Sequence, residues 1–287
     1  MSGVASGVVS SAVAGVEDGA ASELNITLVQ TDISWLAPAQ NLARLSELLA
    51  VYNHSDDNGC NTDLIVLPET FATGFAFDQP GVGEADNGPI VNWLQQTAQA
   101  TGAVVVGSVA VHQGDKNANR LYWVKPDGEV LHYDKRHLFR MGGEHHHVVA
   151  GDKRQVFDIK GVRFLPLVCY DLRFPVWSRN KNDYDVLLNI ANWPGARRRI
   201  WDVLLQARAM ENQCYVVAVN RVGDDGKGVA HSGGSAVYDF KGDTLAIAAD
   251  NQSEIINISV DITALNAFKQ QFPAYLDGDD FELLGRT

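Results

Sequence analysis

The stretch Leu165-Pro-Leu-Val-Cys-Tyr-Asp-Leu-Arg-Phe-Pro175 changes character in its middle. An apolar run typical of a buried strand leads to Cys169, and a polar turn follows, with Pro175 where a helix can begin. A thiol between a strand and a helix N-terminus is placed to react, because the partial positive charge of the helix end favours thiolate. If Cys169 is a nucleophile, the chain must also supply a base and a group that stabilises an oxyanion.

The composition is that of an acidic globular protein. The 287 residues are 46% hydrophobic and 20% charged, enough for one large α/β domain or two small ones. With a net charge of -12 and a pI near 5.0, we expect no nucleic-acid partner, since phosphate contacts need basic patches. The one dense basic run, Arg197-Arg-Arg199, is expected to form a solvated or ion-paired face.

The number of cysteines and the composition of the N-terminal residues indicate the cellular compartment. Three cysteines, at positions 60, 169 and 214, do not make a disulfide framework and favour a reducing, cytoplasmic compartment. No run reaches the roughly 18 apolar residues of a membrane span, so no membrane partner is expected. Residues 1–23 lack the features of a signal peptide or a mitochondrial leader. We expect 1–23 to be a flexible leader and 24–287 to be a single domain.

Strand-like and helix-like segments alternate after the leader. This alternation predicts an α/β fold, and a turn at Lys125-Pro-Asp-Gly128 predicts a hairpin, so the sheets are expected to be mixed. The predicted helix 199–212 carries an apolar stripe on one face, made of Ile200, Val203, Leu204, Ala207 and Met210. The predicted strands are 24–30, 64–67, 103–111, 120–124, 130–133, 162–168, 186–190, 215–220, 235–239, 245–248 and 254–260. The other predicted helices are 38–52, 90–101 and 262–271.

Three residues have positions that suit catalysis. Cys169 could equally be a small buried hydrophobe, the reading that fits Cys60 and Cys214, but it alone separates a strand from a polar turn. Glu69 follows a buried strand, where a carboxylate can act as general base, although a helix-start acid has the same pattern. Lys135 also follows a strand, where a fixed ammonium could stabilise an oxyanion, although a single lysine is usually exposed.

Two other segments attract attention for their composition. Glu144-His-His-His147 invites a metal reading, but three adjacent histidines cannot all point the same way and no HExxH or CxxC accompanies them. We therefore expect the histidines to line or rim a site rather than to bind a metal. The glycine-rich stretch 223–228 is a loop without the spacing of a phosphate-binding motif. GxSxG is absent, which leaves no support for a serine hydrolase of the elbow type.

Taken together, the chain resembles the nitrilase, or carbon–nitrogen hydrolase, superfamily from about residue 24 to about 260. The resemblance rests on three motifs in order, Leu67-Pro-Glu-Thr70, Asp134-Lys-Arg-His-Leu-Phe139 and Val168-Cys-Tyr-Asp-Leu-Arg-Phe174. It implies a four-layer α-β-β-α sandwich with mixed sheets, commonly assembled as a dimer through one helical face. It also implies a triad of Glu69, Lys135 and Cys169, with Glu144 as a second glutamate. No metal or organic cofactor is implied.

Within that superfamily the sequence is most similar to the ω-amidase branch of the bacterial YafV-like type. The resemblance implies hydrolysis of the terminal amide of 2-oxoglutaramate or 2-oxosuccinamate through a Cys169 thioester, with the Tyr170 backbone N–H helping Lys135 to hold the oxyanion. Arg173 is the candidate for the substrate carboxylate, and a structural ion pair with Asp171 or another acid is its alternative. Phe75 and Trp193 are candidates for the pocket wall.

Other functions remain open at this point. An N-carbamoyl amino-acid hydrolase, a deaminated-glutathione amidase or a nitrilase of the same superfamily would use the same catalytic residues. A non-enzymatic interaction protein on this fold is a further alternative, which the intact triad disfavours. A thiol redox sensor would need a resolving cysteine that the sequence does not show.

Overall fold

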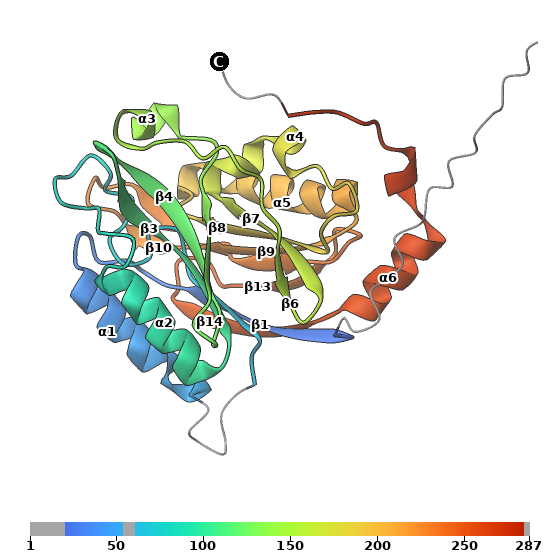
Figure 1. Cartoon of the computed structure of the whole chain (residues 1–287), viewed down its shortest axis with the longest axis horizontal. Helices are drawn as coiled ribbons and strands as arrows, with labels where there is room; N and C mark the ends of the chain where they lie inside the picture. Colours follow the sequence, from blue (N-terminus) through green and yellow to red (C-terminus); the bar gives the residue numbers. More distant parts are fainter. Residues whose placement is uncertain (1–20, 54–60, 284–287) are drawn as a thin grey trace, which may run out of the picture.

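The computed structural model of the chain describes residues 21–53 and 61–283 (Figure 1). Most of the expected leader therefore lies outside the described residues, as does Cys60. The part of it that is described joins the fold, because the Ala21 amide donates to the Lys160 carbonyl and Glu23 opens the first strand.

The first sheet has six strands and takes its order from chain segments far apart in sequence. Strand β2 is central and parallel to both of its neighbours, while the remaining pairs in the sheet are antiparallel. The order is β14 (Glu254–Asp261), β1 (Glu23–Gln30), β2 (Leu64–Val66), β3 (Val104–Gln113), β4 (Lys116–Val124) and β5 (Val130–Asp134).

The second sheet also has six strands, with three parallel strands at its centre. Its order is β13 (Thr244–Ile247), β12 (Ala236–Tyr238), β9 (Tyr215–Asn220), β8 (Val186–Ala191), β7 (Val162–Val168) and β6 (Phe157–Ile159). The central strands β7, β8 and β9 are buried along almost their whole length, which explains their continuous apolar sequences. A separate two-stranded ribbon joins β10 (Val222–Asp224) and β11 (Ala230–Ser232).

Helices cover the outer faces of the two sheets. Figure 1 shows α1 (Pro38–Leu49) and α2 (Pro89–Thr101) together on one side and α5 (Arg198–Asn212) on the other. Both α1 and α2 begin with proline, which suits the first helical turn, and α2 ends at Gly102 with φ 65°. The last helix, α6 (Ile262–Gln271), is capped by Asp261, whose side chain accepts from the Ala264 amide at 2.9 Å.

Short helical segments occupy several of the loops. They are the 3-10 segments η1 (Ala50–Tyr52), η2 (Arg140–Gly142), η3 (Cys169–Arg173), η4 (Gly195–Arg197) and η5 (Ala274–Asp277), and the single turns α3 (Glu144–His147) and α4 (Pro175–Ser178).

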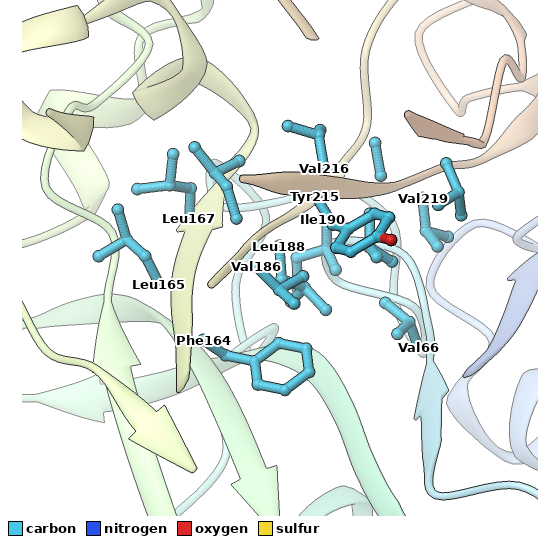
Figure 2. Packing of buried hydrophobic residues seen from close by; sticks show 14 of the residues in the cluster. Val66, Phe164, Leu165, Leu167, Val186, Leu188, Ile190, Tyr215, Val216 and Val219 are labelled. Atoms are coloured by element: carbon cyan, nitrogen blue, oxygen red, sulfur yellow. The ribbon is translucent and has the colours of Figure 1, made fainter. Parts of the chain in front are cut away.

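The main core lies between the two sheets. Trp123 of β4 packs against Phe164 of β7 with ring centroids 5.2 Å apart, which joins the sheets face to face. Figure 2 shows part of this cluster, in which Val66 of β2 lies with apolar side chains of β7, β8 and β9. A second cluster lies between the first sheet and the helices α1 and α2. The predicted four-layer α-β-β-α sandwich with mixed sheets is confirmed.

Most predicted elements are present within a few residues, and two differences matter. Strand β4 begins at Lys116, four residues before the expected start, because a tight turn pairs it with β3 as far as Gln113. The apolar stripe of α5 points outward: Ile200, Val203 and Met210 are exposed, while Trp201, Leu205 and Ala209 face the core. The stripe therefore lies only partly against the core, because Leu204 packs against the main cluster while Ile200, Val203 and Met210 are exposed.

Within the described residues, none of the helices is both long and apolar enough to cross a membrane.

Candidate active site

Four residues predicted for catalysis meet at one edge of the sandwich. Glu69 lies three residues beyond β2, Lys135 directly follows β5, Cys169 directly follows β7, and Glu144 opens α3. Glu69, Lys135 and Cys169 each follow the carboxyl end of a strand, and the carboxyl ends of these strands lie at the same edge. All four are buried, and the side chains of Glu69, Lys135 and Glu144 are inaccessible to solvent.

Lys135 joins the two carboxylates. Its Nζ lies 2.9 Å from Glu69 Oε1 and 3.0 Å from Glu144 Oε1. Burial alone would lower the pKa of this lysine, but the two carboxylates outweigh burial and raise its pKa above the ordinary value. The ammonium is therefore a permanent positive charge beside the thiol.

Glu144 is held from two directions. Its Oε2 accepts from the Phe139 amide at 2.5 Å, and its Oε1 receives the Lys135 ammonium. Burial raises the pKa of Glu144, Lys135 opposes this shift, and the negative charge of Glu69 adds to it. Two buried carboxylates carry one more negative charge than the single Lys135 ammonium balances. One of the two carboxylates can therefore take up a proton.

The loop that carries Lys135 is fixed by a close backbone approach. The Gly151 amide donates to the Lys135 carbonyl at 2.9 Å. A Cβ at position 151 would come within 2.1 Å of the Asp134 carbonyl oxygen, so only glycine fits there. This explains the glycine in the segment Ala150-Gly-Asp152.

Asn119 is a residue of the site that sequence reasoning missed. Its Nδ2 donates to Glu69 Oε1 at 2.8 Å and to Glu144 Oε1 at 3.1 Å, and its backbone carbonyl accepts from the Lys135 amide. It lies in the early part of β4, where the polar sequence reads as a loop. Pairing with β3 makes this stretch a strand, and the hydrogen bonds of Asn119 show that its side chain faces the two carboxylates.

Cys169 is placed by a strained turn. Its φ of 47° lies in the left-handed region, which costs about 1–2 kcal/mol for a residue other than glycine. Its Sγ lies 3.9 Å from the Asn192 carbonyl oxygen. Burial raises the pKa of the thiol well above its ordinary value, the charge of Glu69 raises it further, and Lys135 opposes them. Burial and Glu69 therefore outweigh the groups that favour thiolate, and the proposed chemistry needs a base to remove the proton.

Asn192 holds Glu69 in place through hydrogen bonds, and the sequence did not predict this role. Its backbone amide donates to Glu69 Oε2 at 2.7 Å, and its Nδ2 donates to the Glu69 carbonyl and to Thr70 Oγ1. It follows β8, next to the thiol. Glu69 is thus held by hydrogen bonds on both carboxylate oxygens, and the signal for Asn192 was its place directly after a buried strand.

Asp171 ties the cysteine turn to the lysine loop. Its carboxylate accepts from the Val168 amide, the Tyr133 hydroxyl and the His137 amide at 2.8–3.1 Å. Its partners do not include Arg173, so the alternative of an Arg173–Asp171 ion pair is wrong. Arg173 has no carboxylate partner among residues 21–53 and 61–283.

A cavity of about 260 Å³ opens beside the cluster. Cys169 and Lys135 line it, as do Tyr170 and the three predicted substrate contacts Arg173, Phe75 and Trp193. The Arg173 guanidinium lies 5.3 Å from the Trp193 ring, and the Phe75 ring lies 5.3 Å from Lys135 Nζ. Its small volume suits a small ligand.

The histidine run follows Glu144, whose carboxylate belongs to the cluster. His145, His146 and His147 are not among the residues that line the cavity, so their place at its rim stays a prediction. His145 packs against His146 with ring centroids 3.9 Å apart. In the described part of the chain, no group of three His, Cys, Asp or Glu side chains is arranged to hold a metal ion.

Comparison with known proteins agrees with the geometry. The sequence profile of the carbon–nitrogen hydrolase family matches residues 25–270. The chain is 45% identical to omega-amidase YafV of Yersinia enterocolitica, over 92% of this chain and 100% of the relative. It is 31% identical to 2-oxoglutaramate amidase of Bacillus subtilis, over 88% of this chain and 96% of the relative.

A solved structure is similar over the same range. The crystal structure of a CN-hydrolase superfamily protein from Xanthomonas campestris, which carries an arsenic adduct in its active site, has a TM-score of 0.87 to this chain. The two are 42% identical, and the match covers 91% of this chain and 99% of the other.

Proposed function

The chain belongs to the carbon–nitrogen hydrolase family, and on this premise we propose that it is an ω-amidase. The proposed substrates are small dicarboxylic acid monoamides such as 2-oxoglutaramate or 2-oxosuccinamate, which would yield the 2-oxo acid and ammonia. The names of the relatives support this substrate class. The observation that carries the proposal is a buried cluster of thiol, ammonium and two carboxylates beside a small cavity with an unpaired guanidinium, that of Arg173.

The first half of the proposed reaction forms a thioester. Glu69 takes the proton of the Cys169 thiol, and the sulfur attacks the amide carbon. The Lys135 ammonium and the Tyr170 backbone N–H stabilise the oxyanion of the tetrahedral intermediate. Protonated Glu69 returns the proton to the amide nitrogen, the C–N bond breaks, and ammonia leaves.

The second half reverses the proton transfers with water. Glu69 takes a proton from water, the hydroxide attacks the thioester carbon, and Lys135 again stabilises the oxyanion. The C–S bond breaks, Cys169 recovers its proton from Glu69, and the acid product leaves. Glu144 takes no proton in these steps. It holds the Lys135 ammonium in place, and the same ammonium also faces Glu69.

Arg173 is the proposed partner of the substrate carboxylate. Its guanidinium lines the cavity, lies against Trp193 and Tyr170, and has no acidic partner in the described part of the chain. Guanidinium binds carboxylate through two parallel hydrogen bonds, which also orients the ligand. Trp193 and Phe75 also line the cavity, and their apolar rings would contact the short methylene chain of the substrate.

A substrate panel tests the proposed function. Purified protein is incubated with 2-oxoglutaramate, 2-oxosuccinamate, an N-carbamoyl amino acid and an aliphatic nitrile, and ammonia, CO2 and the acid products are measured. We expect ammonia and 2-oxo acid from the first two at the highest kcat/KM. Preferred release of CO2 from the carbamoyl compound would refute the ω-amidase assignment.

We also propose a homodimer, formed through the outward stripe of α5. Val203 and Met210 are 54% and 51% exposed on this face of the helix, and a second copy of the chain would cover them. A Val203→Asp variant should shift the mass measured by light scattering from dimer to monomer. A monomeric wild type would refute this interface.

The remaining expectations are proposals of the same kind. We propose that residues 24–287 act as one catalytic domain. We propose a cytoplasmic location, because the mechanism needs a reduced thiol and a reducing compartment keeps Cys169 in that state.

A further inference from the structure

The three consecutive arginines at the start of α5 have three different environments. Arg198 is ion-paired, with Nε 2.7 Å from Asp202 Oδ1 and Nη1 2.7 Å from Asp250 Oδ1. Arg199 is exposed to solvent. Arg197 lines the cavity that Cys169 also lines, so the expectation of a uniformly solvated or ion-paired face is wrong at this position.

Arg197 is held in the cavity wall by its neighbours. It ends η4, where its amide donates to the Pro194 carbonyl and its own carbonyl accepts from Trp193 Nε1 at 2.9 Å. Its guanidinium lies 5.2 Å from the Phe139 ring. Among residues 21–53 and 61–283, no carboxylate pairs with it.

Among the described residues, none of the other charged groups of the cavity forms an ion pair with Arg197. Lys227 pairs with Asp78 at 2.9 Å, and the Asp225 carboxylate, which also lines the cavity, accepts from the amides of Lys227 and Val229. Burial, together with the nearby charge of Arg221, lowers the pKa of His231 to about 4, so His231 is neutral. The cavity therefore contains two unpaired guanidiniums, those of Arg173 and Arg197.

The 2-oxo acid end of the proposed substrate fits two guanidiniums. A carboxylate beside a 2-oxo group presents three acceptor oxygens and no donor. One guanidinium can bind the carboxylate through two hydrogen bonds and still leave lone pairs on the carboxylate and the 2-oxo oxygen. A 2-amino acid amide such as glutamine instead presents an ammonium group at the same carbon, and a second guanidinium would repel it.

We infer that Arg197 is the second guanidinium of this subsite, which binds the 2-oxo group together with the carboxylate and excludes substrates that carry a 2-ammonium group. This inference rests on the proposed function, because it assumes a 2-oxo acid amide as substrate. Arg173 then supplies carboxylate affinity, and Arg197 supplies the choice of a 2-oxo group over a 2-amino group.

The test compares three amides that differ only at carbon 2. These are 2-oxoglutaramate, glutaramate, which lacks the oxo group, and L-glutamine, and kcat/KM is measured by ammonia release. In Arg197→Gln we expect the ratio of 2-oxoglutaramate to glutamine to fall about 100-fold, since like-charge contacts cost several kcal/mol. The ratio of 2-oxoglutaramate to glutaramate should fall about 10-fold, which is the loss of one charge-assisted hydrogen bond.

Two further variants separate charge from geometry and from position. Arg197→Lys keeps the charge but loses the planar fork, so it should still discriminate against glutamine while losing part of the 2-oxo preference. Arg199→Gln removes the same charge from an exposed neighbour and should leave both ratios unchanged. An equal effect of Arg199→Gln would show that the general charge of the surface, not Arg197 in the cavity, sets the preference.

The outcomes also separate this inference from the proposed function. If the wild type hydrolyses 2-oxoglutaramate and Arg197→Gln leaves both ratios unchanged, the inference is overturned and the ω-amidase assignment stands. If the wild type releases no ammonia from 2-oxoglutaramate or glutaramate, the proposed function fails and the inference fails with it.

Discussion

Replacement of Asn119 by alanine tests whether the two carboxylates depend on a shared donor. The side-chain amide of Asn119 bridges Glu69 and Glu144 at 2.8 and 3.1 Å in a site closed to solvent. Alanine removes both hydrogen bonds but keeps the backbone bond from the Lys135 amide to the carbonyl of residue 119. The change therefore affects the position and protonation of the carboxylates without releasing the lysine loop.

The expected magnitude follows from these contacts. Each hydrogen bond to a charged group contributes about 1.5–3 kcal/mol, so two give about 3–6 kcal/mol. Asn119 Oδ1 is buried without a partner, and its removal recovers about 1–3 kcal/mol of that loss. The free energy of unfolding should fall by about 2–3 kcal/mol, which lowers Tm by about 3–5 °C for a protein of this size.

The pH dependence of activity gives the sharper readout. The hydrogen bond from Asn119 lowers the pKa of Glu144, which burial raises. Loss of this bond must therefore raise the pKa of Glu144, and the acid limb of the kcat/KM profile should move to higher pH. We expect kcat/KM at its optimum to fall about 10–100-fold, since general-base catalysis contributes about 100–10,000-fold and Glu69 would keep part of it.

Asn117→Ala is the matched control. Asn117 lies two residues earlier on β4 and contacts His112 rather than the carboxylates. It should leave the pH profile in place. A profile for Asn119→Ala that matches the wild type, with only a lower Tm, would show that Asn119 is structural and does not tune the carboxylates.

Three further predictions concern the proposed chemistry. Cys169→Ala should abolish ammonia release while Tm changes little, and measurable turnover in this variant would contradict the thioester. Arg173→Ala should raise KM for anionic amides far more than for a neutral amide, and an equal rise for both would remove its carboxylate role. Glu69 is the proposed acceptor of the thiol proton, and its loss should outweigh the removal of a negative charge that raises the thiol pKa. Glu69→Gln should therefore slow alkylation of Cys169 by iodoacetamide at pH 7 by about 100-fold, as measured by mass spectrometry, whereas an equal or faster rate would contradict the role of Glu69 as base.

The layered fold was predictable because local patterns carry it. Strands that are buried on both faces, such as β7 and β8, read as continuous apolar runs, and prolines mark the starts of α1 and α2. The candidate residues Glu69, Lys135 and Cys169 stood out for a related reason. Each follows a strand end, and strand ends at one edge of a sheet meet in space.

The roles of Asn119, which lies inside a strand, and of Arg197, which lies in a run of three arginines, were not predictable from local patterns. Asn119 lies in a polar stretch that becomes a strand only because it pairs with β3. Strands β3 and β4 pair over 9 residues, and Asn119 is one of them. The sequence shows three consecutive arginines and cannot tell them apart. In the structure Arg197 lines the cavity, Arg198 forms an ion pair and Arg199 is exposed to solvent. The outward stripe of α5 is likewise apolar in sequence but lies opposite the buried Trp201.

The sequence by itself determined the order of the strands and helices and the α/β class, since these follow from periodicity and from position along the chain. The triad of Glu69, Lys135 and Cys169 came from the resemblance of three ordered motifs to the carbon–nitrogen hydrolase family. Only the tertiary structure decided which donors hold Glu69 and Glu144, which arginine lines the cavity, and that burial raises the pKa of the Cys169 thiol. These properties depend on burial and on charges brought together from distant segments. Burial and long-range contact are consequences of packing, which no local window of sequence contains.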